Sequence, residues 1–168
     1  MPVPGTYRLI FVVWRALFNL LTQEGQVRCF GNVADHLIDD GFFVVEAFMP
    51  AFLYRLCTDQ CVDPEAIRVD EVRLDALRHD MATQMIEESH VSLSSAGVRL
   101  NPVIQQYAWP SKLDLMARIA GLRLKYRWGG WHRERWRRPQ RSKRNCGQKS
   151  KPQGRAESAV RPSLQHFY

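Results

Sequence analysis

The sequence predicts an α/β fold with an incomplete, mostly parallel sheet, an antiparallel meander and a disordered basic tail. Two largely apolar runs, at residues 7–14 and 41–49, flank an amphipathic stretch, which is the order strand, helix, strand. Runs without polar alternation are typical of parallel strands that are covered on both faces. Between residues 67 and 109, by contrast, apolar and polar residues alternate, as they do in half-exposed antiparallel strands.

The charge of the chain is distributed unevenly. The 168 residues carry 24 Lys and Arg against 17 Asp and Glu, a formal net charge of +7. Residues 1–130 hold 13 basic and 15 acidic side chains, whereas residues 131–168 hold 11 basic and 2 acidic ones. The basicity therefore belongs to the tail, and whole-chain charge says nothing about the surface of the folded part.

The first predicted unit is a strand, a helix and a second strand. Residues 7–14 form the first strand, and Thr22 is a good N-cap for a helix over residues 23–38. A second buried strand then runs from Gly41 until Pro50 stops it. The three elements make one right-handed crossover unit in a mostly parallel sheet.

The meander comes next, over about residues 67–109. It consists of three half-exposed strands, at residues 67–78, 83–93 and 98–109. Ser111 is the expected N-cap of a short helix that Gly121 closes, and residues 122–128 form a last strand.

The character of the sequence changes after Trp131. Residues 132–168 are rich in Arg, Lys, Ser, Gln and Pro, cannot bury a core, and are expected to be disordered. Their arginines, interleaved with Trp136, offer nucleic-acid binding by phosphate neutralisation and base stacking as an alternative function. We favour the interpretation that the tail is accidental, because a frame-shifted reading of GC-rich DNA would produce a segment of this composition.

The cysteines indicate reduced thiols of a cytoplasmic protein. Cys57 and Cys61 are the only close pair, and a zinc site would need two more ligands at comparable spacing, so no metal is expected. The run from Leu9 to Leu21 is too short to cross a bilayer and has Arg15 at its centre, so no membrane partner is expected either.

Two stretches carry a resemblance to a known family. The first is YRLIFVVWRALFNLLTQEGQVRCFGNVADHLIDDGFFVVEAFMP, and the second is VIQQYAWPSKLDLMARIAGLRLKYRWGGW. Together they resemble the second half of a class I S-adenosylmethionine-dependent methyltransferase. In that family an apolar strand is followed by the motif Leu-Phe-x-Leu and then by a Thr-capped helix. The motif Gly-x-Phe-Val-Val-Glu-x-Phe-x-Pro comes after the helix. The resemblance covers residues 7–131.

The resemblance implies a Rossmann-like sheet, S-adenosyl-L-methionine as the methyl donor and a small molecule as the methyl acceptor. The family builds its cofactor site mainly from a glycine-rich turn after its first strand and an acidic residue after its second. Neither stands before Tyr7, so we expect the chain to be truncated and not to bind the cofactor alone. The unpaired edge of the first strand would favour self-association. A non-catalytic interaction module that pairs with another chain is the alternative.

Four candidate site residues lie on the two predicted parallel strands. Trp14 and Arg15, at the carboxyl end of the first strand, are expected remnants of a cofactor-site wall, because open α/β sheets bind ligands there. A loop that shields a sheet edge is the alternative for this pair. Glu46 and Phe48 of the next strand are substrate-side candidates, and a solvated position at the strand end is the alternative for Glu46.

Three further candidates come from the meander and the closing segment. Alternation puts His90 on the same strand face as Glu88, and such a pair can act as acid and base, although a solvated strand face is the commoner role. Tyr107 and Trp128 could contribute to an aromatic wall of a substrate pocket, whereas core packing is what such residues more often do.

Overall fold

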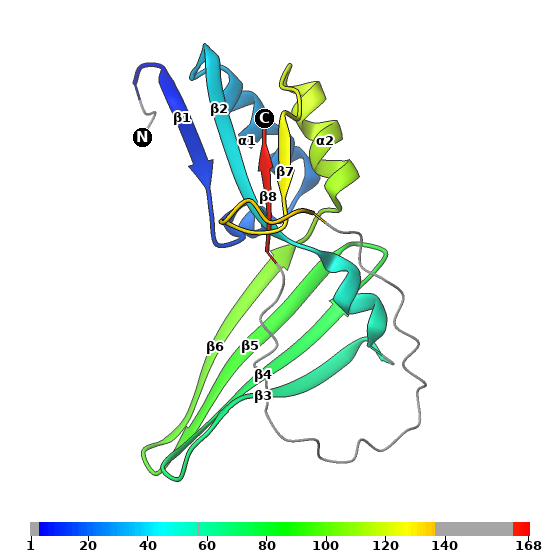
Figure 1. Cartoon of the computed structure of the whole chain (residues 1–168). Helices are drawn as coiled ribbons and strands as arrows, with labels where there is room; N and C mark the ends of the chain where they lie inside the picture. Colours follow the sequence, from blue (N-terminus) through cyan, green and yellow to red (C-terminus); the bar gives the residue numbers. More distant parts are fainter. Residues whose placement is uncertain (1–3, 57, 137–162) are drawn as a thin grey trace. The chain divides into compact units, whose positions relative to one another are not determined.

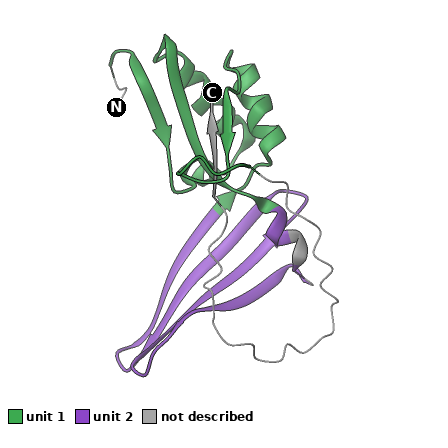
Figure 2. Cartoon of the chain, in the orientation of Figure 1, with its two compact units in different colours: residues 1–50, 105–138, 162–168 green, residues 51–104, 139–161 purple. Residues whose placement is uncertain are grey.

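The computed structural model describes residues 4–56, 58–136 and 163–168. The chain divides into two compact units (Figure 2), each with a four-stranded sheet of its own. Unit 1 takes in residues 1–50, 105–138 and 162–168, and unit 2 takes in residues 51–104 and 139–161. None of the described helices is long and apolar enough to span a membrane.

Unit 1 is built on a sheet with the strand order β1-β2-β8-β7 (Figure 1). β1 (Tyr7–Val12) runs parallel to β2 (Leu37–Phe48), with α1 (Gln23–Ala34) as the crossover helix between them. β8 (Ser163–Phe167) is antiparallel to both of its neighbours, β2 and β7 (Tyr126–Trp128). The structure therefore confirms the α/β fold and the parallel pair of strands. The expectation of a mostly parallel sheet is wrong for the described strands, because β8 runs antiparallel to both of its neighbours.

The start of α1 follows the sequence prediction. A short 3-10 helix, η1 (Ala16–Asn19), separates β1 from it. The side chain of Thr22 accepts a hydrogen bond from the Gly25 N–H at 3.0 Å, which satisfies one of the helix's free donors.

The end of α1 differs from the prediction. The helix stops at Ala34 rather than residue 38, because the following residues join the sheet. The Tyr7 N–H donates to the His36 carbonyl at 2.6 Å, and Leu37 pairs with Tyr7 in the parallel ladder. β2 therefore begins at Leu37, four residues before the predicted Gly41.

Both helices of unit 1 lie on the same side of its sheet (Figure 1). The Phe30 ring of α1 meets the Phe43 ring of β2 edge to face, with centroids 5.2 Å apart. Tyr168 is only 5% exposed, and its ring centroid lies 5.7 Å from the ring centroid of Phe30. The core on this side also includes Leu17, Val45, Leu113, Met116 and Ala117.

The second helix of unit 1, α2 (Pro110–Ile119), begins two residues earlier than predicted. Pro110 stands in its first turn and Trp109 is the N-cap, without a side-chain cap hydrogen bond, so the prediction of Ser111 as N-cap is wrong. Proline suits this position because its fixed φ is helical and its missing N–H would have no partner there. Gly121, with φ of 76°, follows the end of the helix as expected.

Unit 2 is an antiparallel meander of four strands, one more than predicted. η2 (Pro50–Arg55) leads into it. The strands are β3 (Gln60–Ile67), β4 (Glu71–Asp80), β5 (Met85–Ser94) and β6 (Gly97–Gln106), each hydrogen-bonded to the next. β3 escaped prediction because Pro64 lies at a register shift that interrupts its alternation.

The turn between β4 and β5 also lies two residues later than predicted, at residues 81–84. Asp80 organises it: its carboxylate accepts hydrogen bonds from the Thr83 hydroxyl and the Ala82 N–H, both at 2.8 Å. These two hydrogen bonds lower the pKa of Asp80, and the bond from the Thr83 hydroxyl has the larger effect. Gln84 completes the turn with a left-handed backbone, φ 61°.

Most of the expected disordered tail, residues 132–168, falls in the range 137–162, outside the described residues. Its disorder and its nucleic-acid binding therefore stay predictions. Residues 163–167 differ from the expectation, because they form β8 and hydrogen-bond to β2 and β7. A five-residue strand after a long polar stretch gives too short a pattern to be recognised. The interpretation of the tail as an accidental reading stays a prediction.

Candidate functional site

The chain turns sharply at Trp14 and Arg15, just after β1. Both residues have a left-handed backbone, with φ of 56° and 61°, a conformation that costs a non-glycine residue about 1–2 kcal/mol. Glu46 of β2 holds the turn, because its Oε2 accepts a hydrogen bond from the Trp14 N–H at 2.9 Å. The structure thus brings three of the predicted site residues together at one end of the parallel pair.

The other oxygen of Glu46 is engaged as well. Its Oε1 accepts a hydrogen bond from the indole Nε1–H of Trp131 at 3.3 Å. Both indole rings remain open to solvent, with Trp14 86% and Trp131 55% exposed. Glu46 therefore ties the backbone of Trp14 and the indole of Trp131 to the end of the sheet.

Two of the predicted substrate-side residues are core residues instead of an open pocket wall. Phe48 is 2% exposed, and its ring meets the Phe18 ring edge to face at 5.3 Å between centroids. Tyr107 is fully buried, with its ring centroid 6.4 Å from that of Phe48. The Arg15 guanidinium lies 5.7 Å from the Phe48 ring centroid, within the range of a cation–π contact.

Trp128, the last predicted aromatic residue, is half-buried on β7. Its ring stacks on Tyr126 with centroids 5.7 Å apart, and the Arg133 guanidinium lies 5.1 Å from its centroid. These contacts account for its position within unit 1 without a ligand.

The end of the parallel pair fits S-adenosylmethionine poorly. Arg15 places a cation at this end of the sheet, and the sulfonium of the methyl donor is also a cation, so the two would repel each other there. Glu46 uses both oxygens within the protein and is not open to ribose hydroxyls. Within the part of the chain that the structure describes, β1 is followed by Trp14-Arg15 and not by the glycine-rich turn that such a cofactor needs.

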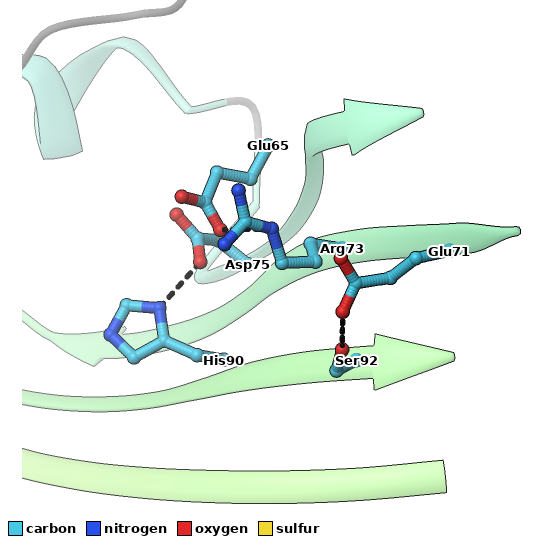
Figure 3. A network of polar contacts seen from close by, with 6 residues as sticks. All are labelled: Glu65, Glu71, Arg73, Asp75, His90 and Ser92. Carbon is cyan, nitrogen blue, oxygen red and sulfur yellow. Dashed lines mark hydrogen bonds and ion pairs between the residues drawn. The ribbon is translucent and has the colours of Figure 1, made fainter. Parts of the chain in front are cut away.

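Unit 2 holds a second group of polar residues, on the β4–β5 hairpin (Figure 3). Asp75 pairs directly with His90 across the two strands, and its Oδ1 lies 2.6 Å from His90 Nδ1. Because an ionised carboxylate can only accept a hydrogen bond, Nδ1 carries the proton of the neutral ring. The lone pair of His90 is then on Nε2, where it can accept a proton from another molecule.

Glu88 completes this group, two residues before His90 on the same strand face, as alternation predicts. It is 3% exposed, and the potential ligand atoms of Asp75, Glu88 and His90 all lie within 4.8 Å of one another. Glu88 also lines a pocket of about 500 Å³, large enough for a small molecule, together with Cys61, Leu77 and Ile104. Two carboxylates and an imidazole are also a donor set that could hold a divalent cation.

Further charged residues surround this group (Figure 3). Arg73 Nε lies 3.8 Å from Glu65 Oε2, and the Ser92 hydroxyl donates to Glu71 Oε1 at 2.6 Å. The hairpin and its neighbour β3 therefore carry the carboxylates of Glu65, Glu71, Asp75 and Glu88, and of these Glu65 pairs with the Arg73 guanidinium. The excess of negative charge attracts cations.

The sequence pattern indicates His90 and Glu88 but not Asp75. The predicted turn at residues 79–82 sets His90 opposite the wrong residue of β4, whereas the observed turn at residues 81–84 sets it opposite Asp75. The signal that could have corrected the register is Asp80 followed by Thr83, since this pair closes a turn through the Asp side chain.

Comparison with solved structures gives several methyltransferases. The CcbJ methyltransferase from Streptomyces caelestis matches with a TM-score of 0.79 and 30% identity, over 98% of this chain and 57% of that one. An S-adenosylmethionine-dependent methyltransferase from Clostridium acetobutylicum ATCC 824 matches with a TM-score of 0.72 and 6% identity, over 99% and 59%. CalS10, an amino pentose methyltransferase from Micromonospora echinaspora whose structure contains bound S-adenosylmethionine, matches with a TM-score of 0.61 and 14% identity, over 99% and 60%.

These matches support the resemblance at the level of the fold. Neither a protein-family model nor a curated protein sequence matches the chain. The chain spans between 57% and 60% of the length of the three solved proteins. Its α/β arrangement is one that S-adenosylmethionine-dependent methyltransferases have.

Proposed function

We propose that this chain is part of an S-adenosylmethionine-dependent methyltransferase and carries groups that bind the methyl acceptor, a small molecule. The observation that supports this most strongly is the likeness to the CcbJ methyltransferase, at 30% identity over 98% of the chain. Because Arg15 and Glu46 do not offer what the methyl donor needs, we propose that donor binding depends on groups outside this chain. The chain alone should then show no methyl transfer.

His90 is the general base of the proposed reaction. An amine or hydroxyl gives up a proton when it is methylated, and His90 Nε2 is the atom that takes that proton. Asp75, bonded to Nδ1 at 2.6 Å, orients the ring and stabilises the imidazolium that forms. A base in this position contributes about 10²–10⁴-fold to the rate.

The acidic surroundings of His90 favour an amine as the acceptor. A protonated amine is drawn to the carboxylates of Asp75 and Glu88, and His90 can then remove its proton to free the lone pair for methylation. Two of the solved proteins fit such an acceptor: CalS10 is an amino pentose methyltransferase, and KedS8 from Streptoalloteichus sp ATCC 53650 is a sugar N-methyltransferase. We propose a small, sugar-like amine.

A single-chain chimera tests this function. The part of the CcbJ methyltransferase that matches this chain is replaced by this chain, and formation of S-adenosylhomocysteine is measured with a panel of amino sugars. We expect turnover, and we expect His90→Asn to lower kcat about 10²–10⁴-fold with little change in the acceptor KM. Asn can still hydrogen-bond to Asp75, so the variant removes the base and keeps the contact.

His132→Asn is the matched control, because His132 is an exposed histidine of unit 1. This variant should keep the kcat of the unmodified chimera. A folded chimera that binds the methyl donor in calorimetry yet methylates no small molecule would refute the proposed function. An unchanged kcat in the His90→Asn chimera would refute the role of the base alone.

A further inference from the structure

Unit 2 contains a second pocket, at the end of the meander that carries the β4–β5 turn. Its volume is about 610 Å³, and the described residues that line it all belong to unit 2. Leu53 of η2, Leu56 just after η2 and Met81 of the turn give it an apolar wall. Pockets of this size and lining bind small molecules in other proteins. The proposed methyl transfer leaves this pocket without a role.

A buried histidine lines this pocket without a partner for one of its ring nitrogens. His79 is 5% exposed, and its Nδ1 has no hydrogen-bond partner among the described residues. The residue opposite it on β5 is Ile86, which is 1% exposed and has no polar side-chain atom to offer. Buried polar atoms are nearly always paired, so an unpaired nitrogen beside a pocket indicates a ligand that supplies the missing contact.

Two carboxylates lie at the same pocket. The His79 N–H donates to the Asp59 carbonyl at 2.8 Å, which extends the β3–β4 ladder and sets the two residues opposite each other. Opposite residues of antiparallel strands share a face, with Cβ atoms about 4.5–5.5 Å apart, so the exposed Asp59 lies beside the buried imidazole. Asp80 adds a second carboxylate, whereas Arg78 of the adjoining pocket is paired with Glu87 at 2.6 Å. The pocket therefore favours positive charge.

We propose that this pocket binds a small organic ammonium ion. The carbon skeleton of the ligand packs on Leu53 and Met81, and its charged nitrogen donates to the Asp59 carboxylate and to His79 Nδ1. A neutral imidazole has one acceptor nitrogen, and Nδ1 is that acceptor when the proton is on Nε2. The ligand thus supplies the hydrogen bond that His79 lacks and the charge that the carboxylates attract.

This pocket is separate from the polar group around His90. His90 pairs with Asp75, and His79 follows Asp75 by four residues on β4. At about 3.3 Å per residue, the two places lie about 13 Å apart along the strand. An amine held at His90 for methylation therefore leaves the second pocket free for another molecule.

Titration of the full chain with benzylamine, an ammonium ion at neutral pH, tests the inference. The histidine ring resonances are followed by NMR, and the spectra of His79→Leu and His90→Asn assign the two rings. We expect the His79 resonances to shift to saturation, and benzyl alcohol, which has a similar shape without the charge, to bind at least about tenfold more weakly. Asp59→Asn should weaken benzylamine binding about 10–100-fold, because it removes the charged partner of the ammonium.

Asp70→Asn is the matched control. Asp70 is also an exposed carboxylate of unit 2, but it lies in the turn before β4, at the opposite end of that strand, so the variant should bind as the wild type does. His79→Leu should abolish binding and stay folded, since it removes the unpaired nitrogen from an apolar neighbourhood. If it unfolds, Asp59→Asn still decides. Equal weakening by the two Asp variants, none by Asp59→Asn, or equally tight binding of benzyl alcohol would overturn the proposal.

This test does not depend on catalysis. Benzylamine that shifts the His90 ring and not the His79 ring would overturn the inference and leave the proposed base untouched. Binding at His79 together with a chimera that transfers no methyl group would leave the inference standing while the proposed function fails.

Discussion

Replacing Glu46 with alanine should release the turn at Trp14 and Arg15. The two left-handed residues together cost about 2–4 kcal/mol. Against that cost, a hydrogen bond from a backbone N–H to a carboxylate contributes about 1.5–3 kcal/mol, and the longer one from Trp131 contributes about 0.5 kcal/mol. Because Glu46 is half-buried, we expect Glu46→Ala to lower the free energy of unfolding by about 1.5–3 kcal/mol.

Urea unfolding, followed by tryptophan fluorescence, measures this loss, and amide exchange at Trp14 reports the broken bond directly. Glu46→Gln keeps an acceptor oxygen without the charge, so it should lose about half as much. Asp39→Ala removes an exposed carboxylate from the same strand and should change stability by no more than about 0.5 kcal/mol. If Glu46→Ala behaved like Asp39→Ala and left the Trp14 amide equally protected, Glu46 would not be what holds the turn.

Two further predictions concern single side chains. The lowered pKa of Asp80 means that its carboxylate stabilises the folded state fully above the unfolded pKa of about 3.9, and that this contribution is lost as the pH falls through the folded pKa. Asp80→Asn should remove that part of the pH dependence of unfolding, and an identical pH profile would contradict the assignment. Gln26 is fully buried, and its amide donates to the carbonyls of Leu20 at 3.1 Å and Gln106 at 2.8 Å. Gln26→Leu should lower the unfolding free energy by about 1–3 kcal/mol in urea titrations, whereas a neutral effect would show that these bonds contribute nothing net.

Sequence patterns predicted the elements whose signals are local. Thr22 caps α1 as expected, and the apolar run after Tyr7 is a strand parallel to the next one. The end of α1 could not be predicted in this way. Residues 37–40 read as the end of a helix by themselves, and only pairing with Tyr7 makes them extended. A long-range contact thus overrode the local preference.

The candidate site in unit 2 depended on strand register. Alternation alone put Glu88 and His90 on one face, because that relation holds within a single strand. The partner of His90 is on another strand, and a turn displaced by two residues changes which residue of β4 faces it. The turn carries no glycine to mark it, since the left-handed position is taken by Gln84. Asp75 was therefore beyond what the pattern could identify.

The place of β8 in the sheet has a consequence for how the chain folds. Each strand of unit 2 pairs with its neighbour in sequence, so this unit can form as soon as residues 60–106 are available. In unit 1, β7 reaches β2 only through residues 163–167, more than a hundred positions after β2. Closing so large a loop is slow compared with forming hairpins. During synthesis on the ribosome, the meander should therefore be complete before residues 163–167, which join the parallel pair to β7, have been made.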